Sequence, residues 1–157
     1  MNTQIRENLL ELLDGKSAHI ALETALKGFP INGIHTRIDR SPHTAWELVE
    51  HIRLAQSDII EYCCGDGYAA PVFPEGYWNL EAGGTINWQN SCDEIISGLH
   101  KLRELVANES ADLLAPLPNG AGHTLFREIL VIADHNSYHL GQIMLIRRMI
   151  EADGREV

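Results

Sequence analysis

Cysteine, long apolar runs and positive charge are all scarce in this sequence. Its three cysteines, Cys63, Cys64 and Cys92, are an odd number and form no CxxC pair, so neither a disulfide framework nor a cysteine zinc knuckle is expected. No apolar run approaches the roughly 18 residues of a membrane helix, and the first seven residues do not resemble a secretory signal. With 12 basic against 22 acidic residues the formal net charge is −10. These absences argue against nucleic-acid and membrane partners and predict a cytoplasmic protein.

Helical periodicity dominates what the sequence does contain. Its 157 residues suit one domain, over 1–157, that buries roughly 70% of the surface exposed by the unfolded chain. Apolar residues recur at helical spacing in four long segments, and no strand pattern stands out. The expected helices cover about residues 3–27, where Gly15 weakens the middle, and then 42–63, 87–108 and 125–151. Four amphipathic helices predict an all-α four-helix bundle.

Residues with strong capping preferences indicate where these helices begin. Ser41 followed by Pro42 is typical of a helix start, because serine caps well and proline tolerates the first helical position. Asn87 and Ser91 are both candidates to cap the third helix, and Thr124 can cap the fourth.

The connections differ greatly in length. Residues 28–40 are expected to form a loop, and the glycines and prolines of 65–85 exclude a helix there. A stretch of about 21 residues without regular structure is long for a compact domain. Extended, it can run back along the second helix, whose length is on the order of 33 Å, so helices two and three can lie parallel. The short 115–122 connection predicts antiparallel third and fourth helices.

Three histidines fall on the apolar faces of the expected helices. His135 and His139 are four residues apart, so their rings project from one face of the last helix and can bind one ion. His51 lies on the apolar face of the second helix. The rings on the last helix are placed in a core-facing stripe by their apolar neighbours Val131, Ile132, Ile143 and Ile146. Three neutral imidazoles suit a divalent ion such as Zn, Ni or Fe and leave positions open for chemistry.

Other metal patterns are excluded by residue type. The peptidase motif His-Glu-x-x-His needs a glutamate where this chain has Asn136. A ferritin-like di-iron site needs a glutamate three residues before each histidine, where this chain has Ile132 and Asn136. The adjacent Cys63 and Cys64, the other five histidines and the three tryptophans are interpreted as packing, surface or hydrogen-bonded residues.

Three segments together resemble a known family. They are PHTAWELVEH at 42–51, Asn87-Trp88 after the crossover, and HNSYHLGQ at 135–142, and they resemble the DinB-like family of damage-inducible and metal-dependent hydrolase proteins. The resemblance spans nearly the whole chain. It implies an up-down-down-up four-helix bundle, a homodimer, and a divalent metal held by His51, His135 and His139. The motifs are fairly specific for this fold and site and much less specific for a reaction.

The resemblance leaves the reaction open. Some members of the family are transferases or isomerases that use bacillithiol or mycothiol, and an open metal can activate water as well as a thiol. We therefore expect a metal-dependent hydrolase or thiol transferase that acts on a small molecule, with a low-molecular-weight thiol as a candidate partner. Glu47 and Tyr138 are candidates to carry a proton or support the metal ligands. The alternative is a non-catalytic bundle that binds metal or a small ligand for sensing, storage or interaction.

Overall fold

The chain is all-helical in the part that the structure describes. A computed structural model describes residues 3–15, 17–64, 67–81, 83–118, 122–152 and 154, and these contain five α-helices and no strand. The helices are α1 (Thr3–Asp14), α2 (Leu22–Lys27), α3 (Ala45–Cys64), α4 (Thr85–Ala107) and α5 (Leu125–Ala152), with 3-10 turns η1 (Ile31–Gly33) and η2 (Glu75–Tyr77). The predicted all-α class is confirmed. None of the described helices is long and apolar enough to cross a membrane.

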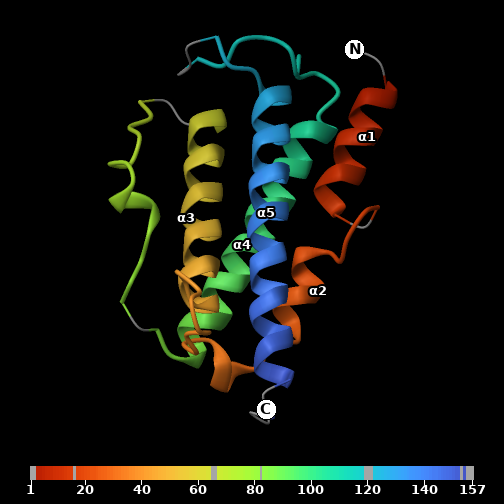
Figure 1. The fold of residues 1–157 in the computed structure, drawn as a ribbon. Helices are drawn as coiled ribbons and strands as arrows, with labels where there is room; N and C mark the ends of the chain where they lie inside the picture. The colour runs from red at the N-terminus through yellow and green to blue at the C-terminus, as the bar shows by residue number, and fades with distance from the viewer. Residues whose placement is uncertain are drawn as a thin grey trace.

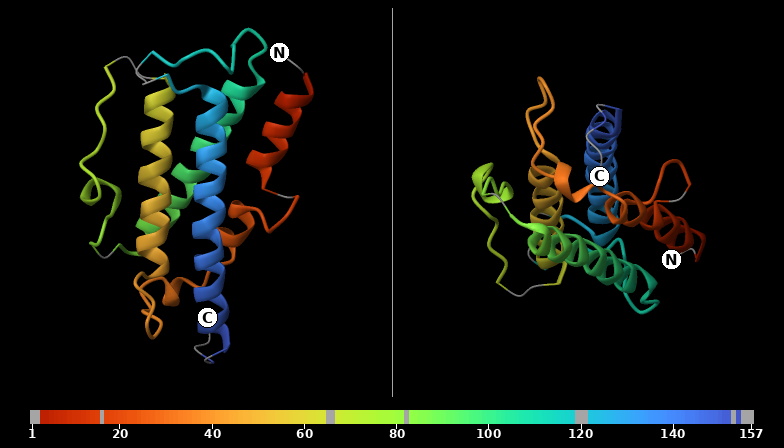
Figure 2. Two further views of the ribbon diagram at one scale, coloured as in Figure 1. Left: turned by 45° about the horizontal axis from the view of Figure 1, so that its top comes forward. Right: turned by 90° about the horizontal axis from the view of Figure 1, so that it is seen from below.

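Three long helices make up most of the molecule (Figure 1). α3 packs against both α4 and α5, while the shorter α1 and α2 pack against α4 and α5 from another side (Figure 2). α3 and α4 run in the same direction and α5 runs in the opposite one (Figure 1). Between α3 and α4 lies the crossover, residues 65–84, and its described residues, 67–81 and 83–84, run back along α3, as its length predicts.

The prediction of one helix over residues 3–27 is wrong, because two helices form there. α1 ends at Asp14, and α2 begins only at Leu22. Gly15 has a φ of 62°, the left-handed conformation in which a helix commonly ends. Apolar residues continue at helical spacing beyond it because α1 and α2 pack against the same two helices. Periodicity therefore records the shared packing surface and misses the break in the backbone.

The predicted start of α3 at Ser41 and Pro42 is too early. The Ser41 hydroxyl donates to the carbonyl of His43, 2.7 Å away, within the loop. Thr44 caps the helix instead, because its hydroxyl accepts from the Glu47 N–H at 3.2 Å while the Glu47 carboxylate accepts from the Thr44 N–H at 3.0 Å. This reciprocal pair is a capping box.

α4 also begins earlier than predicted, at Thr85. Asn87 does act at the helix start, but from inside the first turn, where its side-chain oxygen accepts from the Gly84 N–H at 3.0 Å. Ser91 is no cap. It is buried within α4 and donates its hydroxyl to Glu50 of α3 at 2.6 Å.

The connection between α4 and α5 agrees with the prediction. Thr124 caps α5, since its hydroxyl accepts from the Arg127 N–H at 3.2 Å. A single antiparallel bridge joins Pro116 to Thr124 and tightens the connection. The two helices are antiparallel, as expected for a short link (Figure 1).

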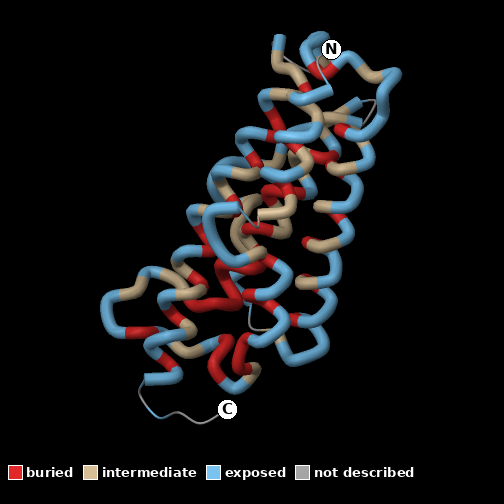
Figure 3. Tube along the Cα trace, turned by 90° about the vertical axis from the view of Figure 1, so that its right-hand side faces the viewer, coloured by how far each residue is buried: buried red, intermediate tan, exposed pale blue. Residues whose placement is uncertain are grey.

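Buried positions lie on the sides of the helices that face one another (Figure 3). Ile52 of α3, Ile95 of α4 and Ile143 of α5 are completely buried in one cluster. Two amides cross this interior: Asn136 donates to the side-chain oxygen of Gln56 at 3.2 Å, and Gln56 donates to the carbonyl of Ile95 at 2.7 Å. The chain segment that carries the histidines of α5 is thus tied to both α3 and α4.

Candidate metal centre

The structure brings together the three histidines that the sequence singles out. His51 extends from α3, and His135 and His139 extend from α5 one turn apart. One ring nitrogen from each lies within 4.8 Å of the other two, a spacing that can hold a metal ion. The Nε2 atoms of His51 and His135 are 3.0 Å apart. The predicted ligand set therefore forms one cluster.

Hydrogen bonds on the far side of two rings fix which nitrogen faces the cluster. His51 Nδ1 lies 2.8 Å from the carbonyl oxygen of Tyr77, and His139 Nδ1 lies 2.7 Å from the side-chain oxygen of Gln142. An oxygen of either kind only accepts, so each Nδ1 carries the proton and each Nε2 keeps its lone pair. Metal-binding histidines are commonly oriented in this way.

The environment keeps all three imidazoles neutral near pH 7. Burial is the largest cause of the lowered pKa of His51 and of His139. For His135, burial and the neighbouring His139 and His51 lower the pKa to about 4. Because a metal ion binds the neutral ring, it has no proton to displace here at neutral pH.

The crossover holds the ring of His51 from outside the helices. The indole of Trp78 stacks on this ring with 4.1 Å between centroids and 5° between planes. Trp78 also stacks on His43, at 4.1 Å and 16°. Together with the Tyr77 carbonyl, these contacts determine both the plane and the rotation of the His51 imidazole. Sequence analysis missed this role, because Trp78 lies in an irregular segment with no period to place it.

A buried carboxylate anchors the crossover beside the site. Glu50 is 2% exposed and accepts hydrogen bonds from Arg53 of its own helix, Ser91 of α4 and Asn79 of the crossover. Burial alone raises the pKa of Glu50, but these hydrogen bonds outweigh it and lower the pKa to about 2. Since Asn79 follows Trp78 directly, Glu50 also fixes the segment that stacks on His51. The sequence gives no periodic signal for this network.

An open pocket of about 720 Å³ lies over the three histidines. It is formed by α3, α5 and the crossover, and its volume suits a small molecule. Its apolar lining consists of Ala55, Ile59, Phe73, Pro74 and Val131. The prediction that Val131 lies on the core-facing stripe is wrong, because this residue is 37% exposed and lines the pocket.

Glu47 and Tyr138, the two candidates to carry a proton or support the metal ligands, occupy different places. Glu47 is buried, where its carboxylate accepts from the Thr44 N–H and, at 2.7 Å, from Arg37. It does not line the pocket over the histidines, and these contacts account for its position. Tyr138 is 66% exposed, lines the pocket, and packs edge-on against His139 with 4.9 Å between ring centroids. Of the two, Tyr138 is placed to reach a bound molecule.

The cysteines lie outside the pocket lining. Cys63, Cys64 and Cys92 are free thiols. Burial raises the pKa of Cys63 and of Cys92 to about 12, so both stay protonated at neutral pH. The interpretation of the adjacent pair as packing residues holds for Cys63, which packs against the core, and is wrong for Cys64, which is exposed. A thiol nucleophile at the histidine cluster would have to come from another molecule.

Comparisons of the chain with models of known families, with curated proteins and with solved structures find no match.

Proposed function

We propose that the protein binds one divalent metal ion through His51, His135 and His139 and uses it in a reaction on a small molecule. The observation that carries this proposal is the convergence of three neutral imidazoles, two of them oriented by oxygen acceptors. Three ligands leave a further position on a tetrahedral ion. The pocket above the cluster gives a substrate access to that position.

We infer either hydrolysis or thiol transfer, as the two reactions that such a centre supports. A bound ion would lower the pKa of water or of a thiol and so supply the nucleophile at neutral pH. Because no cysteine lines the pocket, the thiol would come from a low-molecular-weight thiol partner. Tyr138 is our candidate to hold or carry a proton at its phenol oxygen. Zn, Ni and Fe are all compatible with three nitrogen ligands.

We further propose that the chain is a DinB-like four-helix bundle, with α1 and α2 together in the place of the first helix. The directions of α3, α4 and α5 and the long crossover support this topology. A homodimer is part of the same proposal, and three exposed apolar residues of α5 support it: Leu130, Leu145 and Met149. The free cysteines support a reducing compartment such as the cytoplasm.

Elemental analysis of purified protein tests the metal site. Wild type, His139→Ala and the control His100→Ala are loaded with Zn²⁺ and freed of excess ion. His100 is exposed on α4 and does not line the pocket over the cluster. We expect about one ion per chain in wild type and in the control, and a loss in His139→Ala. No retained ion in any of the three would refute the proposal.

A second experiment separates an enzyme from a non-catalytic binder. The protein is loaded with Co²⁺, and its visible spectrum is recorded while a small thiol is added. An open ligand position predicts a new thiolate-to-cobalt absorption band. An unchanged spectrum would favour the alternative, a bundle that binds metal for sensing or storage without chemistry.

A further inference from the structure

We propose that the pocket over the histidines selects small molecules that carry a positive charge beside an aromatic or apolar group, and that it disfavours carboxylates. This deepens the proposed function, because the same pocket would hold the substrate. The charges of the lining residues carry the inference.

Three carboxylates and no lysine or arginine line this pocket among the residues that the structure describes. The charge of Glu128, which is buried, is balanced by Arg127, which lies 2.5 Å from its carboxylate. Asp58 and Asp134 form no ion pair with any described residue. The lining therefore holds two negative charges that no neighbouring cation neutralises.

Asp58 is held in a fixed orientation. It accepts a hydrogen bond from the phenol of Tyr68 at 2.5 Å and from the phenol of Tyr77 at 2.8 Å. Burial and these contacts with Asp58 raise the pKa of Tyr77 to about 12, and they raise the pKa of Tyr68 as well. Both phenols therefore stay protonated at neutral pH and donate to the Asp58 carboxylate. Since the Tyr77 carbonyl also orients His51, one residue fixes the carboxylate relative to the cluster.

Aromatic rings stand beside these charges. Phe73 of the crossover is 82% exposed and Tyr138 of α5 is 66% exposed, and both line the pocket. The crossover also contributes Tyr77 and Trp78 to the lining. Aromatic faces together with carboxylates are the chemistry that recognises an ammonium group, through cation–π attraction and charge complementarity.

A metal ion at the cluster would not reverse this preference. Asp58 follows His51 by seven residues on α3, which is about 10 Å along the helix axis at 1.5 Å per residue. The charge of Asp58 would therefore still act on the part of a bound molecule that lies away from the ion, whereas Asp134 directly precedes His135 and lies nearer to it. The rest of the molecule would meet the carboxylates and aromatic rings. A thiol or substrate that carries several carboxylates is disfavoured for the same reason.

Two probes that share a phenyl ring test the preference. Phenyltrimethylammonium carries a fixed positive charge and cannot ligate a metal, whereas benzenesulfonate carries a negative charge and ligates weakly. Binding is followed at pH 7.5 by the indole N–H signal of Trp78 in ¹H–¹⁵N spectra, assigned with Trp78→Phe. The protein is used as purified, and its metal content is measured in the same sample.

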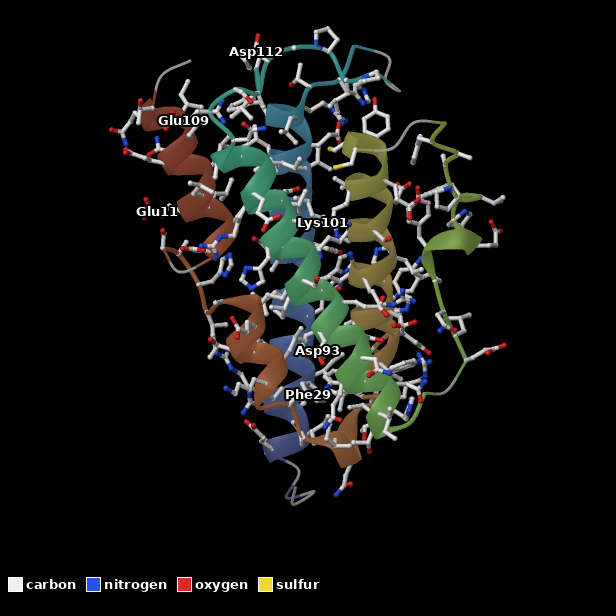
Figure 4. All side chains as sticks on the ribbon, turned by 180° about the vertical axis from the view of Figure 1, so that it is seen from behind. Glu11, Phe29, Asp93, Lys101, Glu109 and Asp112 are labelled. Atoms are coloured by element: carbon white, nitrogen blue, oxygen red, sulfur yellow. The ribbon has the colours of Figure 1, made fainter. Side chains whose placement is uncertain are left out.

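Two neutralising variants and one matched control localise the effect. Asp58→Asn and Asp134→Asn each remove one charge from the pocket, and the exposed position of Asp134 makes its substitution the safer one for folding. Asp93→Asn removes one charge from the exposed face of α4, away from this pocket (Figure 4).

We expect the cation to bind at least about fivefold more tightly than the anion, a lower bound, since a single charge about 4 Å away is worth about 1 kcal/mol even at the dielectric of water. Asp134→Asn and Asp58→Asn should each reduce this ratio, and Asp93→Asn should leave it unchanged. Equal or tighter binding of benzenesulfonate, no saturable shift with the cation, or a ratio unaffected by both pocket variants would overturn the inference. A preference for the cation in a protein that also retains no ion after loading with Zn²⁺ would refute only the metal-dependent function.

Discussion

Replacing Gln142 tests how the metal site is oriented. The Gln142 side-chain oxygen lies 2.7 Å from His139 Nδ1, and this hydrogen bond raises the pKa of His139 against the lowering effect of burial. In Gln142→Leu the acceptor is lost, so the ring is free to rotate and its Nε2 becomes a weaker base. Loss of such a partner typically costs 10- to 100-fold in metal affinity, or about 1.4–2.7 kcal/mol.

The assay is competition for Zn²⁺ against a chromophoric chelator of known affinity at pH 7.5. Gln142→Glu serves as the conservative variant, because a carboxylate accepts the same hydrogen bond and makes the ring more basic. We expect it to bind Zn²⁺ at least as tightly as wild type. Gln89→Leu, an exposed position on α4, controls for a general loss of polarity. Thermal unfolding of each metal-free variant checks that the fold is kept.

One result would refute this reasoning directly. If Gln142→Leu bound Zn²⁺ as tightly as wild type while His139→Ala lost the ion, His139 would not depend on its oxygen acceptor. The hydrogen bond to Gln142 would then not be what orients the His139 ring for metal binding. A loss of affinity in Gln89→Leu of equal size would instead attribute the effect to the fold.

Three further predictions concern stability. Glu50→Ala leaves the donors of Arg53 and Ser91 without their acceptor. Urea titration should show that the free energy of unfolding falls by about 3–5 kcal/mol. A loss below about 1 kcal/mol would mean that these hydrogen bonds do not stabilise the fold. The free energy of unfolding of metal-free protein should fall as the pH falls from about 6.5 to about 4. The reason is that the unfolded chain protonates His135 over this range and the folded chain does not. In His135→Asn this part of the pH profile should be flatter. In Gly98→Ala the new Cβ would clash with the side-chain amide of Gln56, which is held by hydrogen bonds with the Ile95 carbonyl and Asn136. Urea titration should show a loss of about 1–3 kcal/mol in the free energy of unfolding, whereas no loss would mean that Gln56 moves aside freely.

Helical periodicity located the histidines because each lies on a long helix. His51 is fixed by its place on α3, and the four-residue spacing of His135 and His139 fixes their common direction on α5. Which helices become neighbours followed from connection lengths. A short link made α4 and α5 antiparallel, and the long crossover allowed α3 and α4 to run in the same direction.

Backbone breaks and exact helix starts were harder to predict from the sequence. The periodicity continued across Gly15 because two short helices share one packing surface. α3 is capped at Thr44, and not at Ser41, because Thr44 and Glu47 form reciprocal hydrogen bonds. A capping preference is local and weak, so several residues near a helix end can satisfy it. Tertiary contacts then select one of them. At this end of α3, Trp46 is buried and donates from Nε1 to the Glu81 carbonyl.

The groups that orient the ligands come from tertiary structure, and this explains why the sequence pattern finds the ligands without finding their supports. The Tyr77 carbonyl and the Trp78 ring reach His51 only because the crossover runs back along α3. That path is fixed in turn by Glu50, through Asn79, and by Asp58, through the Tyr77 phenol. Two carboxylates on α3 thus set the position of an irregular segment, and the segment sets the ring that would bind the metal. Removing the acceptor oxygens of either residue, as in Glu50→Ala or Asp58→Ala, should therefore disturb the site from a distance, which periodicity alone cannot predict.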